Sequence, residues 1–264
     1  MKRYQVLDLF SGAGGMAEGF LQAGFDIPFA SDRSPQAALT YEYRHREQLG
    51  YKLDYFCGDV QELAEEKKLK EFLGKDFFNI DVICGGPPCQ GFSMAGKRNP
   101  DDLRNQLVRS YINILKQIQP KYFVMENVTG ILSAKFSVYQ GQFQSYENEL
   151  VTKVLLKEFT EIGYENVVIK TLDASNYGVP QRRKRVIFLG TRDDINIQLV
   201  HPEPLKSQKT TARDALSDLE HIEIGSKIEK YTNQAKSNYQ IDSKAGRTPN
   251  SKGKKVKSKK LANH

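Results

Sequence analysis

The stretch that decides the fold is QVLDLFSGAGG, residues 5–15. It begins as an apolar, strand-like run and ends as a glycine-rich turn that opens a helical pattern over residues 14–23. Such a turn lets a ligand approach the backbone at the N-terminus of a helix. Gly12, Gly14 and Ala17 also satisfy the loose pattern G-x-G-x-x-A, which favours a nucleotide-like cofactor. The pattern alone is weak evidence, because a glycine-rich turn can also be a simple chain reversal.

Strand and helix patterns alternate along most of the chain. Strands are expected at residues 5–10, 27–31, 53–57, 80–85, 122–125, 167–172 and 185–190, and helices at 14–23, 35–49, 60–73, 103–117 and 149–162. This order predicts an α/β fold with a doubly wound, mostly parallel sheet. Ligands of such sheets bind beyond the carboxyl ends of the strands. The residues that follow each strand are therefore the functional candidates.

Acidic residues follow the second and third expected strands, as Asp32 and Asp59. A carboxylate in this place can bond the hydroxyls of a ribose. A single acid after a strand is often only a helix N-cap. Two acids combined with a glycine-rich first turn favour an adenosine-bearing ligand, which at this point could carry either a hydride or a methyl group.

The three cysteines lie in different surroundings. Cys57 and Cys84 fall in strand-like runs and are expected to be buried small hydrophobic residues. Cys89 instead follows GGPP, residues 85–88, on a loop at the ligand edge of the sheet. Prolines fix the backbone that carries this thiol, glycines leave room for a flat substrate, and a thiolate is a strong nucleophile. Cys89 is the candidate nucleophile, and a plain structural cysteine is the alternative.

A carboxyl group, an amide and a basic run complete the set of candidates. The fifth expected strand leads into Glu126 and Asn127, where burial could raise the pKa of the carboxyl for proton donation. The run QRRKR, residues 181–185, leads into the last strand. Basic runs usually form solvated surface. Here, alternation along a strand would place Arg183 and Arg185 on one face, from which both could point into the site.

Four blocks taken in order resemble the signature motifs of cytosine-C5 DNA methyltransferases. They are DLFSGAGG at residues 8–15, GPPCQGFS at 86–93, ENV at 126–128 and QRRKR at 181–185. The resemblance covers residues 4–220. It implies the Rossmann-like fold of S-adenosylmethionine-dependent methyltransferases, with S-adenosylmethionine as the cofactor, double-stranded DNA as the substrate and no metal.

The resemblance also implies a role for each catalytic candidate. Cys89 would attack C6 of a cytosine that is flipped out of the duplex, and Glu126 would hydrogen-bond and protonate N3. Arg183 and Arg185 would steady the base, and Asn127 would hold the Cys89 loop. Residues 93–103 would form a mobile loop that closes over DNA.

The resemblance further implies the cofactor contacts, with Phe10 against the adenine, Asp32 at the ribose and Asp59 at the adenine amino group. The full set of implied cofactor-binding residues is Phe10, Ser11, Gly12, Gly14, Gly15, Asp32, Asp59, Val60, Pro88 and Leu107.

The sequence departs from the family pattern after residue 190. Family members usually continue with a DNA-reading domain and a final block that completes the cofactor pocket. We expect a catalytic, cofactor-binding domain at 1–200, a linker at 201–224 with a capped helix in residues 211–216, and a flexible tail at 225–264. We therefore expect a second polypeptide to supply the missing parts, which makes this chain the catalytic subunit of a split, heterodimeric enzyme. A shortened or degenerate gene product is the alternative.

The net charge of +7 is concentrated in the tail, since residues 225–264 hold eleven basic and two acidic side chains. A solvated end is the simpler interpretation, and contact with phosphates or a partner chain is the alternative. The cysteines lack metal-ligand spacing, and the sequence shows neither a signal peptide nor an apolar run long enough to cross a bilayer. These features predict a cytoplasmic protein.

Three other functions stay open. A transfer RNA cytosine-C5 methyltransferase would use the same cysteine and Glu-Asn blocks. A nicotinamide-dependent oxidoreductase would explain the glycine-rich turn but not Cys89 or Glu126. A non-catalytic scaffold of the same family would leave both residues without a task. In bacteria the usual setting of the family is a restriction-modification system.

Overall fold

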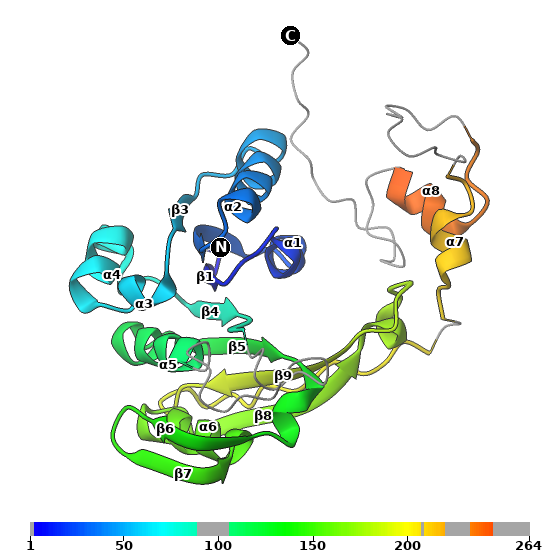
Figure 1. Ribbon diagram of the computed structural model, residues 1–264. Coiled ribbons are helices and arrows are strands. Elements are labelled where there is room, and N and C mark those ends of the chain that lie inside the picture. The colour runs from blue at the N-terminus through cyan, green and yellow to red at the C-terminus, as the bar shows by residue number, and fades with distance from the viewer. Residues whose placement is uncertain (1–2, 89–105, 207–208, 220–232, 245–264) are drawn as a thin grey trace. The chain divides into compact units, whose positions relative to one another are not determined.

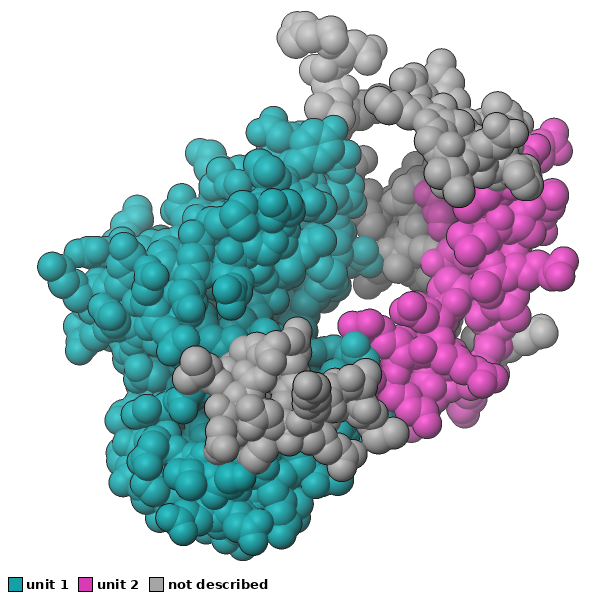
Figure 2. Space-filling view, in the orientation of Figure 1, with its two compact units in different colours: residues 1–171, 185–201, 259–264 teal, residues 172–184, 202–258 magenta. Residues whose placement is uncertain are grey.

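The computed structural model describes residues 3–88, 106–206, 209–219 and 233–244. The chain divides into two compact units (Figure 2). The first unit comprises residues 1–171, 185–201 and 259–264, and the second comprises residues 172–184 and 202–258. Residues 172–184 thus group with the later part of the chain, and the expected bounds at residues 200 and 224 stay a prediction.

A seven-stranded sheet in the order β3-β2-β1-β4-β5-β9-β8 forms the centre of the first unit (Figure 1). Its strands are β1 Gln5–Leu9, β2 Asp26–Asp32, β3 Asp54–Cys57, β4 Val82–Gly85, β5 Tyr122–Asn127, β8 Asn166–Asp173 and β9 Lys184–Thr191. The first five strands run parallel to their neighbours, and β9 runs antiparallel to β5. The predicted α/β fold with a doubly wound, mostly parallel sheet is confirmed. The strand order reverses at β1, where ligands of such sheets bind.

Helices cover the sheet on both faces. They are α1 Gly15–Gln22, α2 Pro35–Glu42, α3 Val60–Leu63, α4 Glu66–Leu73, α5 Gln106–Ile118 and α6 Val151–Glu161. The expected helix 35–49 is two segments, because α2 continues into a π-helix, η1 Tyr43–Gln48. The expected helix 60–73 is also divided. The side-chain amides of Asn113 and Gln117 donate to the carbonyl oxygen of Ala64, which stabilises the break between α3 and α4.

Two hydrophobic clusters occupy the two faces of the sheet. The larger contains side chains of α3, α4, α5 and α6, and the smaller contains side chains of α1 and α2. Alternation along β5 and β9 sends Phe123 and Phe188 into the larger cluster. On the opposite face, Val124 pairs with Leu189, and both are only half-buried by the described residues. At β5 and β9, the described residues thus cover one face of the sheet closely and the other only in part.

A two-stranded hairpin between β5 and α6 was absent from the sequence prediction. Its strands are β6 Lys135–Gln140 and β7 Ser145–Leu150. Phe136, Tyr139 and Tyr146 are buried and anchor it to the larger cluster. The backbone N–H of Gln142 in its turn donates to the buried Glu158 carboxylate of α6 at 2.7 Å. The hairpin is therefore held at its strands and at its turn.

The second unit contains two short helices, α7 Ala212–Leu216 and α8 Asn238–Lys244. The expected capped helix is confirmed, because Thr211 and Asp214 form a capping box at the start of α7. Helix α8 lies in the segment predicted to be a flexible tail. Gln240 of α8 is 2% exposed and donates to the hydroxyl of Ser217 at 3.0 Å. Among the described helices, none is long and apolar enough to span a membrane.

Candidate cofactor and catalytic site

The glycine-rich turn between β1 and α1 adopts left-handed backbone angles. Phe10 has φ 56°, Gly12 has φ 53° and Gly14, the N-cap of α1, has φ 91°. A Cβ atom at Gly12 or Gly15 would meet nothing within 4 Å, whereas one at Gly14 would lie 2.5 Å from Cε1 of His45. Gly12 and Gly15 therefore border open space, and Gly14 packs against the protein. The unpaired N–H groups of a helix start give such a turn affinity for polar or anionic ligand groups.

Asp32, at the end of β2, holds this turn in place. Its Oδ2 accepts a hydrogen bond from the backbone N–H of Gly12 at 2.9 Å, and its Oδ1 accepts one from Ser34, also at 2.9 Å. The preceding residue of the turn, Ser11, lies with its hydroxyl 3.0 Å from that of Tyr55 on β3. Side chains of the two neighbouring strands thus fasten the backbone of the turn.

Asp59 follows β3 and is the N-cap of α3, where its Oδ1 accepts from the backbone N–H of Gln61 at 2.9 Å. Asp59 is therefore a helix N-cap, and the cap uses one of its two carboxylate oxygens. Val60 beside it is buried. Cys57 corrects the sequence interpretation, since it is exposed rather than buried. The reason is that β3 is an edge strand of the sheet, where a side chain lacks neighbours on one side.

Asn127, at the end of β5, binds the segment that leads to Cys89. It is 3% exposed, and its Nδ2 donates to the carbonyl oxygen of Pro87 at 3.1 Å. Its Oδ1 accepts from the backbone N–H of Val128 at 2.9 Å. Pro87 is buried and Pro88 half-buried. Cys89 and the expected mobile loop at residues 93–103 lie outside the described residues.

Glu126 and Arg185 form an ion pair at the same edge. Nε of Arg185 lies 2.7 Å from Oε1 of Glu126, and each side chain is 26% exposed. Gly86 allows the carboxylate to come close to the loop backbone, because a Cβ atom there would lie 3.2 Å from Oε2 of Glu126. Arg183 belongs to the second unit, where its side chain is exposed and its carbonyl oxygen accepts from the N–H of Ala174. The predicted role of Arg183 stays a prediction.

A buried polar cluster behind the turn was not singled out from the sequence. Asp8 of β1 is 1% exposed and accepts hydrogen bonds from Tyr41 and from the thiol of Cys84, each at 3.3 Å. Burial raises the pKa of the Asp8 carboxyl to about 7. Cys84 is buried, as expected, but it is a hydrogen-bond donor as well as a small hydrophobic residue. The available signal was the acid inside the apolar run VLDLF, since a buried carboxyl needs polar partners.

Most of the expected site residues of the first unit meet at one edge of the sheet. That edge carries the turn after β1, the acids after β2 and β3, the loop after β4 and the Glu-Asn pair at the end of β5. Leu107, in the first turn of α5, is 7% exposed and packs in the larger cluster. The residues brought to the edge are Phe10, Ser11, Gly12, Gly14, Gly15, Asp32, Asp59, Pro88, Glu126, Asn127 and Arg185.

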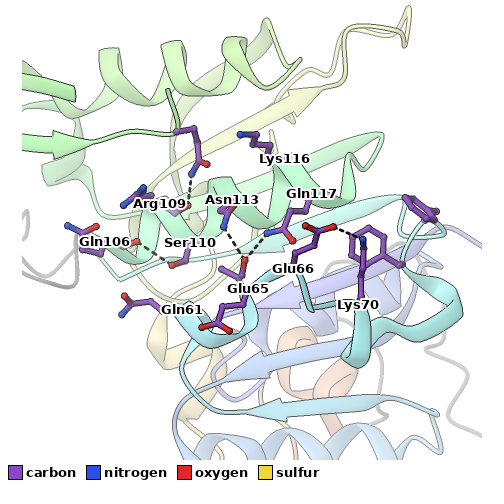
Figure 3. Close-up of a pocket in the computed structure, with 14 residues that line it drawn as sticks. Gln61, Glu65, Glu66, Lys70, Gln106, Arg109, Ser110, Asn113, Lys116 and Gln117 are labelled. Atoms are coloured by element: carbon purple, nitrogen blue, oxygen red, sulfur yellow. Dashed lines mark hydrogen bonds and ion pairs between the residues drawn. The ribbon is translucent and has the colours of Figure 1, made fainter. Parts of the chain in front are cut away.

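A separate pocket of about 780 Å³ opens between α4 and α5 (Figure 3). Its lining is mostly polar or charged and includes Glu65, Lys70 and Arg109. None of the residues predicted for the site lines it. The functional candidates therefore lie at the sheet edge and not in this pocket.

Comparison with known proteins identifies relatives along nearly the whole chain. Residues 4–263 match the family described as C-5 cytosine-specific DNA methylase. The type II methyltransferase M.DdeI of Desulfomicrobium norvegicum is 34% identical over 249 residues, which are 92% of this chain and 55% of that protein. M.FnuDI of Fusobacterium nucleatum is 38% identical over 232 residues, covering 87% of this chain and 59% of that protein. The chain thus spans little more than half the length of these curated relatives.

Solved structures agree with the fold. One, described as a DNA modification methyltransferase encoded within a prophage (E. coli), superposes with a TM-score of 0.65 and 32% identity, and the match covers 83% of this chain and 56% of that one. A mutant DNMT2 of Spodoptera frugiperda superposes with a TM-score of 0.55 at 24% identity, covering 83% of this chain and 60% of that one, which supports the fold alone.

Proposed function

Because this chain belongs to the C-5 cytosine-specific DNA methylase family, we propose that it transfers a methyl group from S-adenosylmethionine to C5 of cytosine in DNA. The observation that carries the proposal is the meeting of the glycine-rich turn with Glu126, Arg185 and the Asn127-bound loop at one sheet edge. Its relatives are named as type II methyltransferases, which supports a role in a restriction-modification system.

The sheet edge fits S-adenosylmethionine. Gly12 and Gly15 leave open space at the N-terminus of α1, where the backbone can receive a polar ligand group. Asp32 would bind the ribose hydroxyls, Asp59 the adenine amino group, and Phe10 would pack on the adenine. Ser11, Gly14, Val60, Pro88 and Leu107 complete the proposed set. When bound, the cofactor supplies an electrophilic methyl group on a sulfonium.

Glu126 would act on the cytosine ring. Its carboxyl group would hydrogen-bond and protonate N3, which withdraws electrons from the ring and prepares C6 for nucleophilic attack. Arg185 lies beside this carboxylate and can also stabilise negative charge that develops on the base. Arg183 is proposed to assist in the same way.

Cys89 would be the nucleophile that attacks C6, which makes C5 nucleophilic enough to accept the methyl group. Loss of the C5 proton and elimination of the thiolate would then restore the aromatic ring. Asn127 would act on this step through the backbone, since it holds the carbonyl of Pro87 two residues before Cys89. A cytosine must leave the duplex to reach these groups, so base flipping belongs to the proposal.

A second polypeptide that carries the recognition domain also stays a proposal. It is supported by the partly covered face of β5 and β9, where the half-buried Val124, Ile187 and Leu189 lie beside Glu126 and Arg185. Apolar side chains in that position favour packing by another segment. Purification of the tagged chain from its native cells, followed by identification of any stoichiometric partner, tests this proposal.

Transfer of labelled methyl groups from S-adenosylmethionine to unmethylated DNA tests the main proposal. The preparation should be the chain purified with whatever binds it. Label at cytosine C5 that disappears in Cys89→Ser is the expected result, and Cys57→Ser is the matched control that keeps activity. Label on transfer RNA and none on DNA would favour the alternative substrate. No label on either would leave a non-catalytic role.

A further inference from the structure

The glycine-rich turn packs directly against two side chains that contact each other. A Cβ atom at Gly14 would lie 2.5 Å from Cε1 of His45 and 3.1 Å from Cδ2 of Tyr41. The two rings pack in a tilted arrangement with centroids 4.1 Å apart, and Nδ1 of His45 lies 2.8 Å from the carbonyl oxygen of Tyr41. Both residues are buried. A shift of the Tyr41 ring would therefore change the packing against Gly14.

Tyr41 also connects the turn to the interior of the sheet. Its hydroxyl donates to Asp8 of β1, and Asp8 accepts a second hydrogen bond from Cys84 of β4. Asp8 and Cys84 are direct partners in the parallel ladder. Strand β4 leads on to Gly86 and Pro87, so one buried carboxyl lies between the cofactor turn and the segment that leads to Cys89.

Asp8 changes its charge near neutral pH. Burial and, less strongly, the charge of Asp32 raise the pKa of Asp8, which the hydrogen bonds from Cys84 and Tyr41 lower in part, to about 7. Tyr55 of β3 is a further titratable group close enough to be affected by Asp8. Burial lowers the pKa of His45, whereas the hydrogen bond with the carbonyl oxygen of Tyr41 and the charge of Glu18 raise it in part. Asp8 is thus the group of this cluster that titrates around pH 7.

We propose that Tyr41 is a positioning residue for the cofactor turn, which supports Gly14 from behind and transmits the charge of Asp8 to it through its hydroxyl. A carboxylate accepts a stronger hydrogen bond than a neutral carboxyl does. Ionised Asp8 therefore holds the Tyr41 ring more firmly, and the turn becomes a better cofactor site as the pH rises through about 7. By linkage, cofactor binding favours ionised Asp8 and releases a proton. This inference rests on the proposed function, because it assumes that the turn binds the cofactor.

Calorimetric binding of S-adenosylhomocysteine to the chain purified with whatever binds it, at about pH 6 and about pH 8, tests the inference. The wild type should bind about three- to tenfold more tightly at the higher pH, the range expected for one hydrogen bond. Tyr41→Phe should bind more weakly at the higher pH and lose the dependence on pH, and Asp8→Asn should lose it too. Tyr43→Phe, at a position that is 61% exposed on the neighbouring turn, should behave as the wild type.

An unchanged pH dependence in folded Tyr41→Phe would overturn the inference. Should this variant lack native circular dichroism, the wild type still decides. Its binding enthalpy near pH 7, in two buffers of different ionisation enthalpy, should show release of a fraction of a proton, and no release would overturn the inference. Absence of binding by the wild type at both pH values would contradict the proposed function, and this inference would fail with it.

Discussion

Glu126 and Arg185 pair across two antiparallel strands, with Nε of the arginine 2.7 Å from Oε1 of the glutamate. The register of β5 and β9 places Glu126 opposite Ile187, and Asn127 opposite Val186. Arg185 is therefore on the same face as Glu126, two residues from its direct partner. A strand that returns to the sheet late in the chain thus supplies a positive charge to a carboxylate at the ligand edge.

Removal of the Glu126 carboxylate should stop catalysis without unfolding the protein. In Glu126→Gln, methyl transfer to DNA should fall about 100-fold or more, since a positioned general acid contributes at least that much. The side chain is partly exposed, so the melting temperature should change little. Glu147→Gln, on the exposed side of the hairpin, is the matched control. Full activity in Glu126→Gln would exclude the proposed role.

The hydrogen bond from Asn127 should stabilise the folded chain. Asn127→Ala leaves the carbonyl of Pro87 without this buried partner, which should lower the free energy of unfolding by about 1–3 kcal/mol. Chemical denaturation measures this loss, and Asn166→Ala at an exposed strand start should show almost none. An equal effect of the two substitutions would mean that the bond contributes nothing specific.

Alanine substitutions at two glycines with nearly the same backbone φ distinguish the energetic cost of backbone strain from that of a steric clash. Gly14 has φ 91° and Gly24 has φ 92°, but only a Cβ atom at Gly14 meets neighbouring atoms. Both alanine substitutions should cost about 1–2 kcal/mol through left-handed strain. Gly14→Ala should cost about 1–3 kcal/mol more, because the new methyl group clashes with His45. Thermal unfolding of the two variants measures the difference, and equal melting temperatures would contradict the packing described for Gly14.

Asp8 should make the stability of the chain depend on pH. Its pKa is raised in the folded protein from 3.8 to about 7, so the unfolded chain loses this proton first as the pH rises. The stability that the raised pKa of Asp8 contributes to the fold is fully present below about pH 4 and is lost as the pH rises through about 7. The loss is on the order of 4 kcal/mol at most, from 1.36 kcal/mol per pKa unit. Asp8→Asn lacks this titration.

Urea denaturation at about pH 5 and about pH 8 tests this expectation. The free energy of unfolding of the wild type should fall relative to that of Asp8→Asn between the two conditions. Asp81→Asn, a partly exposed acid at the start of β4, provides a comparison for general effects of charge. A constant difference between wild type and Asp8→Asn would show that Asp8 does not titrate in this range.

The sequence predicted the sheet because strand–helix alternation is a local signal. The runs at β1, β2, β4 and β5 are apolar and short, and each ends in a recognisable turn or acid. The hairpin β6–β7 was missed, since its buried Phe136 and Tyr139 are three residues apart and break the strict alternation of a strand. The π-helix η1 was missed because its sequence reads as a plain continuation of α2.

The candidate site was predictable where residues follow strands and not where partners are distant in sequence. Asp32, Glu126 and Asn127 lie at strand ends and Asp59 lies two residues after one, so topology alone brings them to one edge. The cluster of Asp8, Tyr41 and Cys84 joins residues 33 and 76 positions apart. Only packing in three dimensions shows that a strand acid, a helix tyrosine and a second strand meet behind the turn.

Two acids at the sheet edge hold the backbone and are also proposed to bind the ligand. Asp32 accepts a hydrogen bond from Gly12, and Asp59 caps α3. A substitution at either position would remove a hydrogen bond that holds the backbone together with a proposed ligand contact. Such a substitution would therefore also destabilise the fold. Selection for folding alone would therefore retain these residue types in a descendant that had lost its activity. The presence of both acids at this edge is consequently a poor indicator that a related sequence is still an active enzyme. A substitution of Gly15, which borders open space and has no packing role, is a better sign that activity has been lost.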